Sequence, residues 1–132
     1  MNKNYNVRDN IIFGEHYKKE KYMGGIRRFT ISSDTLKRLV YDGFADKMEC
    51  QNYSPYIKDF LEDTNEDVEL TFGGYAVSPE RDDYRVTIDE VYVTIPFDKH
   101  KELAYFAERY HSADEFTVDV DDNTYKIRAW WD

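Results

Sequence analysis

Alternation of apolar and polar side chains recurs along this chain with a period of two, and it restricts the possible folds more than any other feature. The pattern is clear where Tyr84, Val86 and Ile88 alternate with polar residues. Successive side chains of a β-strand point to opposite faces of a sheet, so this alternation indicates strands with one buried face. The pattern predicts strands at residues 25–32, 68–77, 84–95, 115–120 and 125–131.

Turn-forming sequences separate these strands and predict that most neighbours are antiparallel. The stretch 78–83 reads SPERDD, and residues 121–124 read DDNT. Two further features predict irregularities within strands. The alternation slips by one residue at Asp89 and Glu90, and Gly73 begins a Gly-Gly pair. A slip of phase indicates a β-bulge, and paired glycines indicate a bulge or a close approach of two backbones.

Three segments between the strands carry signals of helix starts. Ser33, Ser54 and Asp98 are suitable N-cap residues, and Pro55 suits a first helical position. The first helix is expected to end at Gly43. After Asp98, apolar residues recur at i, i+3, i+4 and i+7 and so lie on one helix face: Leu103, Phe106, Ala107 and Tyr110.

The predicted elements follow the order β-α-α-β-β-α-β-β, which indicates an α+β fold. We expect a largely antiparallel sheet of about five strands with three helices packed mainly on one face. The inward side chains of these elements should form one core: Phe29, Ile31, Leu39, Phe60, Leu70, Phe72, Val86, Ile88, Val93, Leu103, Phe106, Val118 and Ile127.

The chain of 132 residues, 41% of them apolar, has the size of one ordinary domain. Residues 1–24 lack periodicity, are rich in Asn, Lys and Tyr, and lead into the Gly24-Gly25 pair. We therefore expect an irregular basic N-terminal arm at residues 1–24 and a single α+β domain at residues 25–132. Removing such an arm should leave the melting temperature nearly unchanged.

Charge is distributed unevenly along the chain, whose formal net charge is −9. Residues 1–30 carry seven Lys or Arg against three Asp or Glu, whereas residues 31–132 carry eleven against twenty-four. Residues 61–95 contain ten acids, with Arg81 and Arg85 as the only cations. An acidic surface repels nucleic acids and anionic lipids. We therefore expect a basic protein surface as the partner, and neither nucleic acid nor membrane bound by the acidic part.

The basic segment at the N-terminal end has two interpretations. Its cations are interleaved with aromatic residues, a pattern that occurs in proteins that bind nucleic acid. Docking onto the acidic part of the same chain explains the pattern equally well. The residues concerned are Tyr17, Lys18, Lys19, Lys21, Tyr22, Arg27 and Arg28.

The sequence predicts a cytoplasmic location. It has no run of about 18 apolar residues that would span a membrane. The polar stretch MNKNYNVRDN lacks the apolar segment of a secretory signal. Cys50 is the only cysteine, so no disulfide forms within the chain, which fits a reducing compartment.

Motifs for metals, cofactors or catalysis are weak. Residues 119–124 partly match a calcium-binding loop, but Thr124 stands where glycine is required, and a hairpin turn explains the sequence as well. Cys50 and the histidines show no nucleophile arrangement. Four acids could hold a hard cation, but the strand phase scatters them, which favours solvated carboxylates: Asp82, Asp83, Asp89 and Glu90. We expect no cofactor, no metal and no catalytic residue.

The expected contact surface is acidic and aromatic. Twelve Tyr, eight Phe and two Trp exceed what a core of this size requires, and Tyr is favoured at interfaces. Reversing the charge of Asp82 and Asp83 is expected to leave folding intact. We assign partner binding to acids and tyrosines of one region: Glu66, Asp67, Glu69, Glu80, Asp82, Asp83, Tyr84, Asp89, Glu90 and Tyr92.

These features point to a small non-enzymatic binding protein. By class analogy, it is similar to inhibitors from phages and mobile elements that occupy the nucleic-acid groove of a host defence nuclease, of the anti-CRISPR or anti-restriction type. Carboxylates spaced over a rigid sheet would replace phosphates in such a groove. Two alternatives remain: a generic protein–protein adaptor, and a small enzyme whose site forms from residues distant in sequence.

Overall fold

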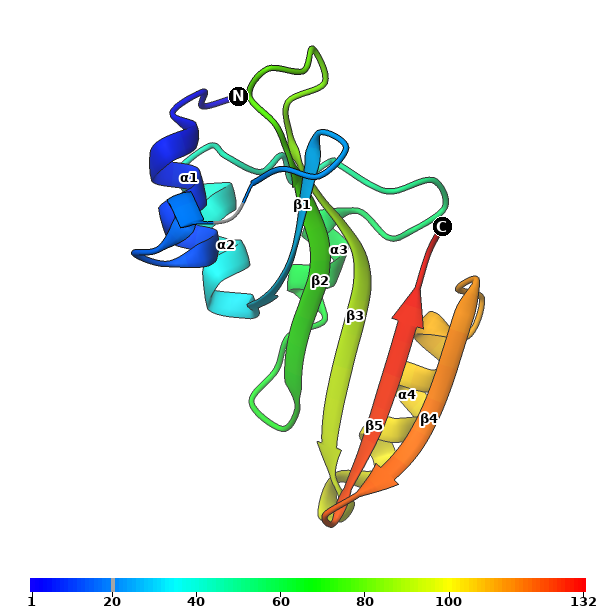
Figure 1. Cartoon of the computed structure of the whole chain (residues 1–132). Helices are drawn as coiled ribbons and strands as arrows, with labels where there is room; N and C mark the ends of the chain where they lie inside the picture. The colour runs from blue at the N-terminus through cyan, green and yellow to red at the C-terminus, as the bar shows by residue number, and fades with distance from the viewer. Residues whose placement is uncertain (20) are drawn as a thin grey trace.

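The computed structural model describes residues 1–19 and 21–132 and confirms the α+β class (Figure 1). Within these residues, a five-stranded antiparallel sheet combines with four α-helices and two short 3-10 helices. The predicted order of elements is present, preceded by one additional helix. The elements are α1 (Tyr5–Phe13), η1 (Tyr17–Lys19), β1 (Ile26–Ser32), α2 (Ser33–Tyr41), α3 (Ile57–Glu62), β2 (Glu69–Val77), β3 (Val86–Pro96), η2 (Phe97–Lys99), α4 (His100–Tyr110), β4 (Glu115–Asp121) and β5 (Thr124–Trp130).

The strand order in the sheet is β1-β2-β3-β5-β4, with antiparallel neighbours throughout. β5 pairs with β3, so β4 lies at one edge and β1 at the other. In the view of Figure 1, α3 and α4 lie behind the sheet and α2 lies beside β1, and in the described part of the chain no helix covers the front face. Leu39 of α2 is buried in the same core as Phe60 of α3 and Phe106 of α4. The predicted packing of helices on one face is therefore observed.

A β-bulge interrupts the pairing of β2 with β3. Gly73 pairs with Glu90, and the register shifts before Gly74, so Asp89 is the additional residue on β3. The strands approach closely at this point, because a Cβ on Gly74 would lie 2.0 Å from the carbonyl oxygen of Thr87. This single feature confirms both the predicted bulge and the predicted close approach.

The core lies between the sheet and the helices, and eleven of the thirteen predicted core residues are buried. Leu103 is only partly buried, and the prediction for Val118 is wrong because its side chain is 43% exposed. Val118 belongs to the edge strand β4, whereas α4 packs mainly on β3 and β5. Alternation identifies the two faces of a strand, but it does not show whether the helices extend over that strand.

A helix stands where an irregular arm was expected at residues 1–24. Asn4 caps α1 through its side chain, and Ile11–Phe13 at its C-terminal end pack against the core. The helix has no clear apolar stripe, so periodicity did not reveal it. In the predicted basic arm, Glu20 lies outside the described residues, and the side chain of Lys19 is not described either.

Arg8 attaches α1 to the rest of the molecule. Its buried guanidinium donates hydrogen bonds to Asp9 Oδ1 at 2.9 Å, to Val77 O at 3.0 Å and to Tyr22 Oη at 2.6 Å. It also lies 4.4 Å from the centre of the Tyr84 ring. A buried cation is tolerated only when it is paired and hydrogen-bonded, and two of these partners belong to the region beyond residue 25. The helix is therefore an integrated part of the fold.

Candidate partner-binding surface

The sheet face opposite the helices, which we call the open face, is polar. The register of the strands arranges its side chains in rows across the sheet. One row contains Ser32, Thr71, Tyr92, Arg128 and Thr117, and the next contains Glu69, Thr94, Lys126 and Asp119. A groove of about 460 Å³ crosses these rows, and its lining combines apolar carbon with the hydroxyl and charged groups of their side chains. The open face therefore offers both hydrogen-bond donors and acceptors to a partner.

The bulge places Asp89 on the open face, where it is neutralised by Arg28. Asp89 is only 4% exposed and accepts two hydrogen bonds from the Arg28 guanidinium, at 2.9 and 3.0 Å. The hydrogen bond to Asp89 raises the pKa of Arg28. The expectation of a solvated carboxylate is wrong for Asp89, because the fold buries it and supplies the opposite charge from β1, a strand distant in sequence.

Glu90 has a similar environment one residue further along β3. It is 8% exposed and accepts a hydrogen bond from Arg128 Nε at 2.7 Å. Burial, followed by a hydrogen bond to Glu90, raises the pKa of the neighbouring Tyr92. Glu90 is therefore not a free acid, contrary to the expectation, whereas the half-buried Tyr92 does line the groove of the open face.

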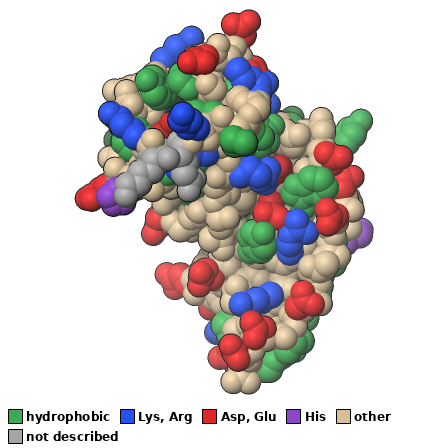
Figure 2. Space-filling model, in the orientation of Figure 1, with side chains coloured by type: hydrophobic (Ala, Val, Ile, Leu, Met, Phe, Trp, Pro, Cys, Tyr) green, Lys and Arg blue, Asp and Glu red, His purple; other side chains and the backbone are tan. Residues whose placement is uncertain are grey.

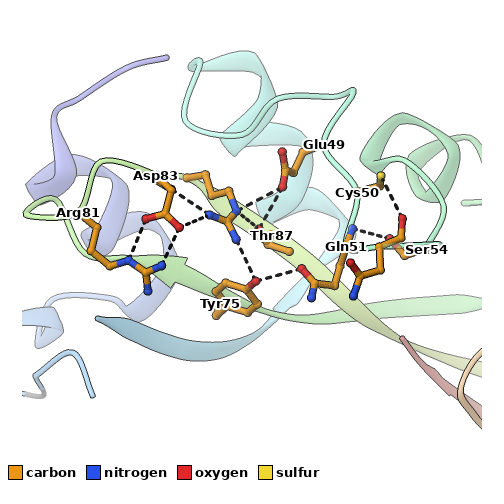
Figure 3. A network of polar contacts seen from close by, with 10 residues as sticks. Glu49, Cys50, Gln51, Ser54, Tyr75, Arg81, Asp83 and Thr87 are labelled. Carbon is orange, nitrogen blue, oxygen red and sulfur yellow. Dashed lines mark hydrogen bonds and ion pairs between the residues drawn. The ribbon is translucent and has the colours of Figure 1, made fainter. Parts of the chain in front are cut away.

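The turn between β2 and β3 holds Asp83 between two arginines (Figure 3). Asp83 accepts hydrogen bonds from Arg81 Nε at 2.8 Å and Arg81 Nη2 at 2.7 Å, and from Arg85 Nη1 at 2.8 Å. These hydrogen bonds, first from Arg85 and then from Arg81, lower the pKa of Asp83. Glu80 and Asp82 in the same turn are exposed and form no ion pair with any described residue.

Tyr84 faces inward and does not supply the expected contact area. Its ring lies against the buried Arg8, and its hydroxyl is buried without a hydrogen-bond partner among the described residues. Burial raises the pKa of Tyr84. The alternation correctly indicated an inward residue, but the assignment of Tyr84 to the contact surface is not supported by its position.

The remaining predicted acids lie at the other end of the sheet. Glu66, Asp67 and Glu69 are exposed near the start of β2, whereas the turn at residues 78–83 follows its end. A strand of this length separates the two groups by about 26 Å. The ten assigned residues therefore do not form one surface. Asp63, an acid a few residues before Glu66, is buried and accepts hydrogen bonds from Tyr105, Arg109 and Tyr110.

Other acids join Glu66, Asp67 and Glu69 at that end of the sheet. Asp67 and Asp98 line the same shallow pocket, and the backbone of Phe97 donates to the carbonyl of Asn123 at 3.1 Å, which links η2 to the β4–β5 turn. We call the resulting group the acidic end, and its members are Glu66, Asp67, Glu69, Asp98, Asp119, Asp121 and Asp122. Sequence reasoning assigned only the first three, because the others are brought together by strand order.

Exposed charges are separated in the molecule. Over residues 61–132, fifteen exposed Asp or Glu side chains stand against five exposed Lys or Arg. Over the described part of residues 1–60, three exposed acids stand against seven exposed cations. On the open face, Figure 2 shows Asp and Glu concentrated over the lower half and the right edge of the view. The C-terminal half of the chain therefore presents the negative surface.

The basic segment at residues 17–28 does not present all of its cations to solvent. Arg28 pairs with Asp89, and Arg27 is buried, with its guanidinium 3.6 Å from the centre of the Phe13 ring. Lys18 and Lys21 are exposed. The fold thus uses both arginines in internal contacts with residues distant in sequence.

Residues with possible chemistry lie apart from one another. The loop expected at residues 119–124 is a hairpin turn in which Asp122 and Asn123 have positive φ angles of 46° and 65°. Cys50 Sγ lies 3.6 Å from the carbonyl oxygen of Asn52. In the described residues, no group of three or more His, Cys, Asp or Glu is arranged to hold a metal ion. None of the described helices is long and apolar enough to span a membrane.

Comparison with known proteins gives no relative from which a function could be transferred. No family model, no curated protein and no solved structure matches this chain.

Proposed function

We propose that this protein is a small, non-enzymatic binding protein of the cytoplasm whose acidic end and adjacent open face bind a basic protein surface. The excess of exposed carboxylates over residues 61–132 carries this proposal. The partner that best complements such a surface is a protein whose Lys and Arg side chains normally bind nucleic acid. The protein would act as an inhibitor by nucleic-acid mimicry, as phage and mobile-element inhibitors of defence nucleases do.

The sheet supports this function because it holds the carboxylates at regular spacings. Alternate residues on a strand are about 6.7 Å apart, and neighbouring strands are about 4.8 Å apart. Asp119 and Asp121 lie on one face of β4, and Glu69 lies in the same row as Asp119. Carboxylates fixed in this way lose little entropy when they meet guanidinium or ammonium groups.

A competition experiment tests the proposal. The tagged protein would be incubated with a bacterial lysate, and bound proteins would be eluted with increasing salt or with double-stranded DNA. We expect nucleic-acid-binding proteins to be retained at low salt and released by either treatment, because the same cationic groups would contact phosphate or carboxylate. Retention of proteins that DNA does not displace would contradict mimicry.

Two triple variants with equal changes in net charge provide the control. The first reverses the acidic end through Glu66→Lys, Asp67→Lys and Glu69→Lys. The second reverses exposed acids of the N-terminal half through Glu15→Lys, Asp34→Lys and Asp46→Lys. The first should lose the DNA-displaceable proteins, and the second should retain them. If both variants lose these proteins to the same extent, binding depends on the net charge of the protein and not on a defined surface.

A protein–protein adaptor is a second candidate, favoured by exposed aromatic side chains. Tyr53 is 99% exposed and Tyr41 is 91% exposed, and large aromatic residues are enriched at interfaces. Binding through such residues would depend little on salt. Replacing both with Ser should therefore abolish salt-resistant binding if this candidate is correct.

A further inference from the structure

β4 is an edge strand with a free hydrogen-bonding side. Its only neighbour among the described strands is β5, and its seven residues pair with β5 without a shift in register. It contains no proline. In Figure 1 no element lies beyond β4 on its outer side. Such an edge is a template for a further strand, and natural proteins usually interrupt or cover it.

The β4–β5 turn determines which backbone groups are free. Asp121 pairs with Thr124, and the two residues between them have positive φ angles, as in a two-residue hairpin turn. Pairs then alternate between hydrogen-bonded and non-hydrogen-bonded along the hairpin. The N–H and C=O groups that point away from β5 belong to three residues: Phe116, Val118 and Val120.

The two faces of β4 differ in character. Glu115, Asp119 and Asp121 are exposed on the open face. Lys126 pairs with Asp121 at 3.3 Å, and Arg128 lies 3.5 Å from Glu115, so on the open face of the two strands two cations stand against three acids. The face therefore keeps a negative excess beside the free edge.

The opposite face of β4 carries exposed apolar residues. Val118 is 43% exposed and Val120 is 67% exposed. Val120 pairs across the hairpin with Tyr125, whose ring centre lies 4.9 Å from that of the exposed Phe97. These four residues form an apolar shelf next to the edge, on the helix side of the sheet, where α4 packs mainly on β3 and β5. An added strand would find acids on one face and apolar side chains on the other.

We propose that the edge of β4 receives an extended segment of a partner protein as a sixth strand, and that this segment alternates Lys or Arg with apolar residues. Main-chain hydrogen bonds to Phe116, Val118 and Val120 would provide affinity, and the two faces of β4 would select the alternating pattern. The basic character of the segment rests on the proposed function, and the inference adds the binding mode.

A second copy of this chain fits the edge poorly. Antiparallel pairing of β4 with itself about Val118 would place Glu115 opposite Asp121 and Thr117 opposite Asp119 of the other copy. Like charges directly opposite one another destabilise a pair of strands. A basic segment would place opposite charges at the same positions, so charge complementarity selects a different protein as the occupant.

Amide hydrogen exchange with a defined peptide tests the proposal. The probe is a blocked peptide of about nine residues that alternates Lys and Val, and the controls replace Lys with Glu or separate Lys and Val into two blocks. The alternating Lys peptide should slow exchange at Phe116, Val118 and Val120 by about tenfold or more at saturation. The amides of Thr117 and Asp119, which already face β5, should change little.

Two substitutions separate edge pairing from general charge attraction. Val118→Pro removes the outward N–H of residue 118. Proline is tolerated at this position because the missing N–H lies on the free side of an edge strand and forms no bond within the sheet. Val118→Thr keeps that N–H and serves as the control. We expect the Pro variant to lose protection of Phe116 and Val120 and the Thr variant to retain it, with both checked for folding by circular dichroism. As a second measurement, Glu115→Lys with Asp119→Lys should reverse the preference toward the Glu peptide.

Three results would overturn the proposal. One is equal protection by the Lys and Glu peptides, and another is protection that Val118→Pro does not affect. The third is protection of the same amides without peptide together with a dimer in sedimentation analysis, which would assign the edge to a second copy. If the lysate partners bind the Val118→Pro variant normally but are lost on reversal of the acidic end, the edge inference fails while the proposed function stands.

Discussion

At the scale of single residues, carboxylates of the same type have different roles according to the cations that the fold brings to them. Asp82 is exposed, Asp83 lies between Arg81 and Arg85, and Asp89 is buried against Arg28. A charged group remains in a poorly solvated position only when a partner compensates its lost hydration. Exposure and partner, more than acidity, therefore decide which of these residues could bind another protein.

Reversing the charge of Asp82 and of Asp83 should have different effects on stability. Asp83→Lys would place a third cation beside two guanidiniums that now share one carboxylate, so we expect a lower melting temperature. Asp82→Lys makes the same change in net charge without breaking an ion pair and should leave the melting temperature nearly unchanged. Thermal unfolding followed by circular dichroism compares the two. Equal melting temperatures of the two variants would indicate that Asp83, like Asp82, is a solvated acid whose ion pairs do not stabilise the fold.

Tyr110 should make stability depend on alkaline pH. Its hydroxyl donates to Asp63 Oδ2 at 2.6 Å, and burial, followed by this hydrogen bond, raises its pKa above the ordinary 10.0. The unfolded chain releases this proton near pH 10, whereas the folded chain retains it. The contribution of Tyr110 to the free energy of unfolding is therefore complete below about pH 10, and it is lost as the pH rises further.

Urea unfolding at about pH 8 and about pH 11 measures this effect. The Tyr110→Phe variant should lose less stability between the two pH values than the native protein does. Tyr53→Phe removes the same number of titrating groups from an exposed position and serves as the control. If the free energy of unfolding of Tyr110→Phe falls between the two pH values as much as that of the native protein, other groups cause the loss of stability at alkaline pH.

At the scale of secondary-structure elements, helix α4 and strand β4 differ in how much of their apolar surface is covered. Phe106 on α4 is fully buried, so Phe106→Ala should reduce the free energy of unfolding by about 3–5 kcal/mol. Val118→Ala on the edge strand should cost less than about 1 kcal/mol. Chemical denaturation measures both. A loss below about 1 kcal/mol for Phe106→Ala would mean that the α4 stripe does not pack on the sheet.

Helix α1 should contribute to stability, in contrast to the arm expected from the sequence. Arg8→Ala would leave Asp9 buried without its cation, a change that costs about 3–5 kcal/mol in comparable buried pairs. Deleting residues 1–13 should likewise lower the melting temperature. The exposed Lys3→Ala is the control and should have little effect. If Arg8→Ala unfolds at the same urea concentration as the native protein, the helix is not anchored as described.

At the scale of the whole molecule, the order of charge along the chain becomes a separation in space. The N-terminal helices lie at the upper left of Figure 1, and α4, β4 and β5 lie at the lower right. Among the described residues, seven of the twelve exposed Lys and Arg lie in residues 1–60 and fifteen of the eighteen exposed Asp and Glu lie in residues 61–132, so the molecule is asymmetric in charge. Such an asymmetry orients an approaching basic surface toward the acidic end before contact.

Features of the fold that depend on local periodicity could be predicted from the sequence. The five strands, the hairpin turn, the α4 stripe and the bulge at Asp89 were all predicted, since each follows from neighbours within a few residues. The helix boundaries were predicted less closely: α2 is capped by Ser32 instead of Ser33, and α3 begins at Ile57 after the Ser54-Pro55 signal. Cap positions shift by a residue or two because several polar side chains compete for them.

Which charged residues face solvent and which strand lies at the edge of the sheet depend on tertiary contacts and could not be predicted from local patterns. The pairing of Asp89 with Arg28 joins β3 to β1, and the burial of Arg8 requires Val77 and Tyr84. The exposure of β4 follows from β5 lying between it and β3. Each of these facts depends on contacts between segments far apart in the chain, and a local pattern carries no information about them, because alternation is the same for a central strand and for an edge strand.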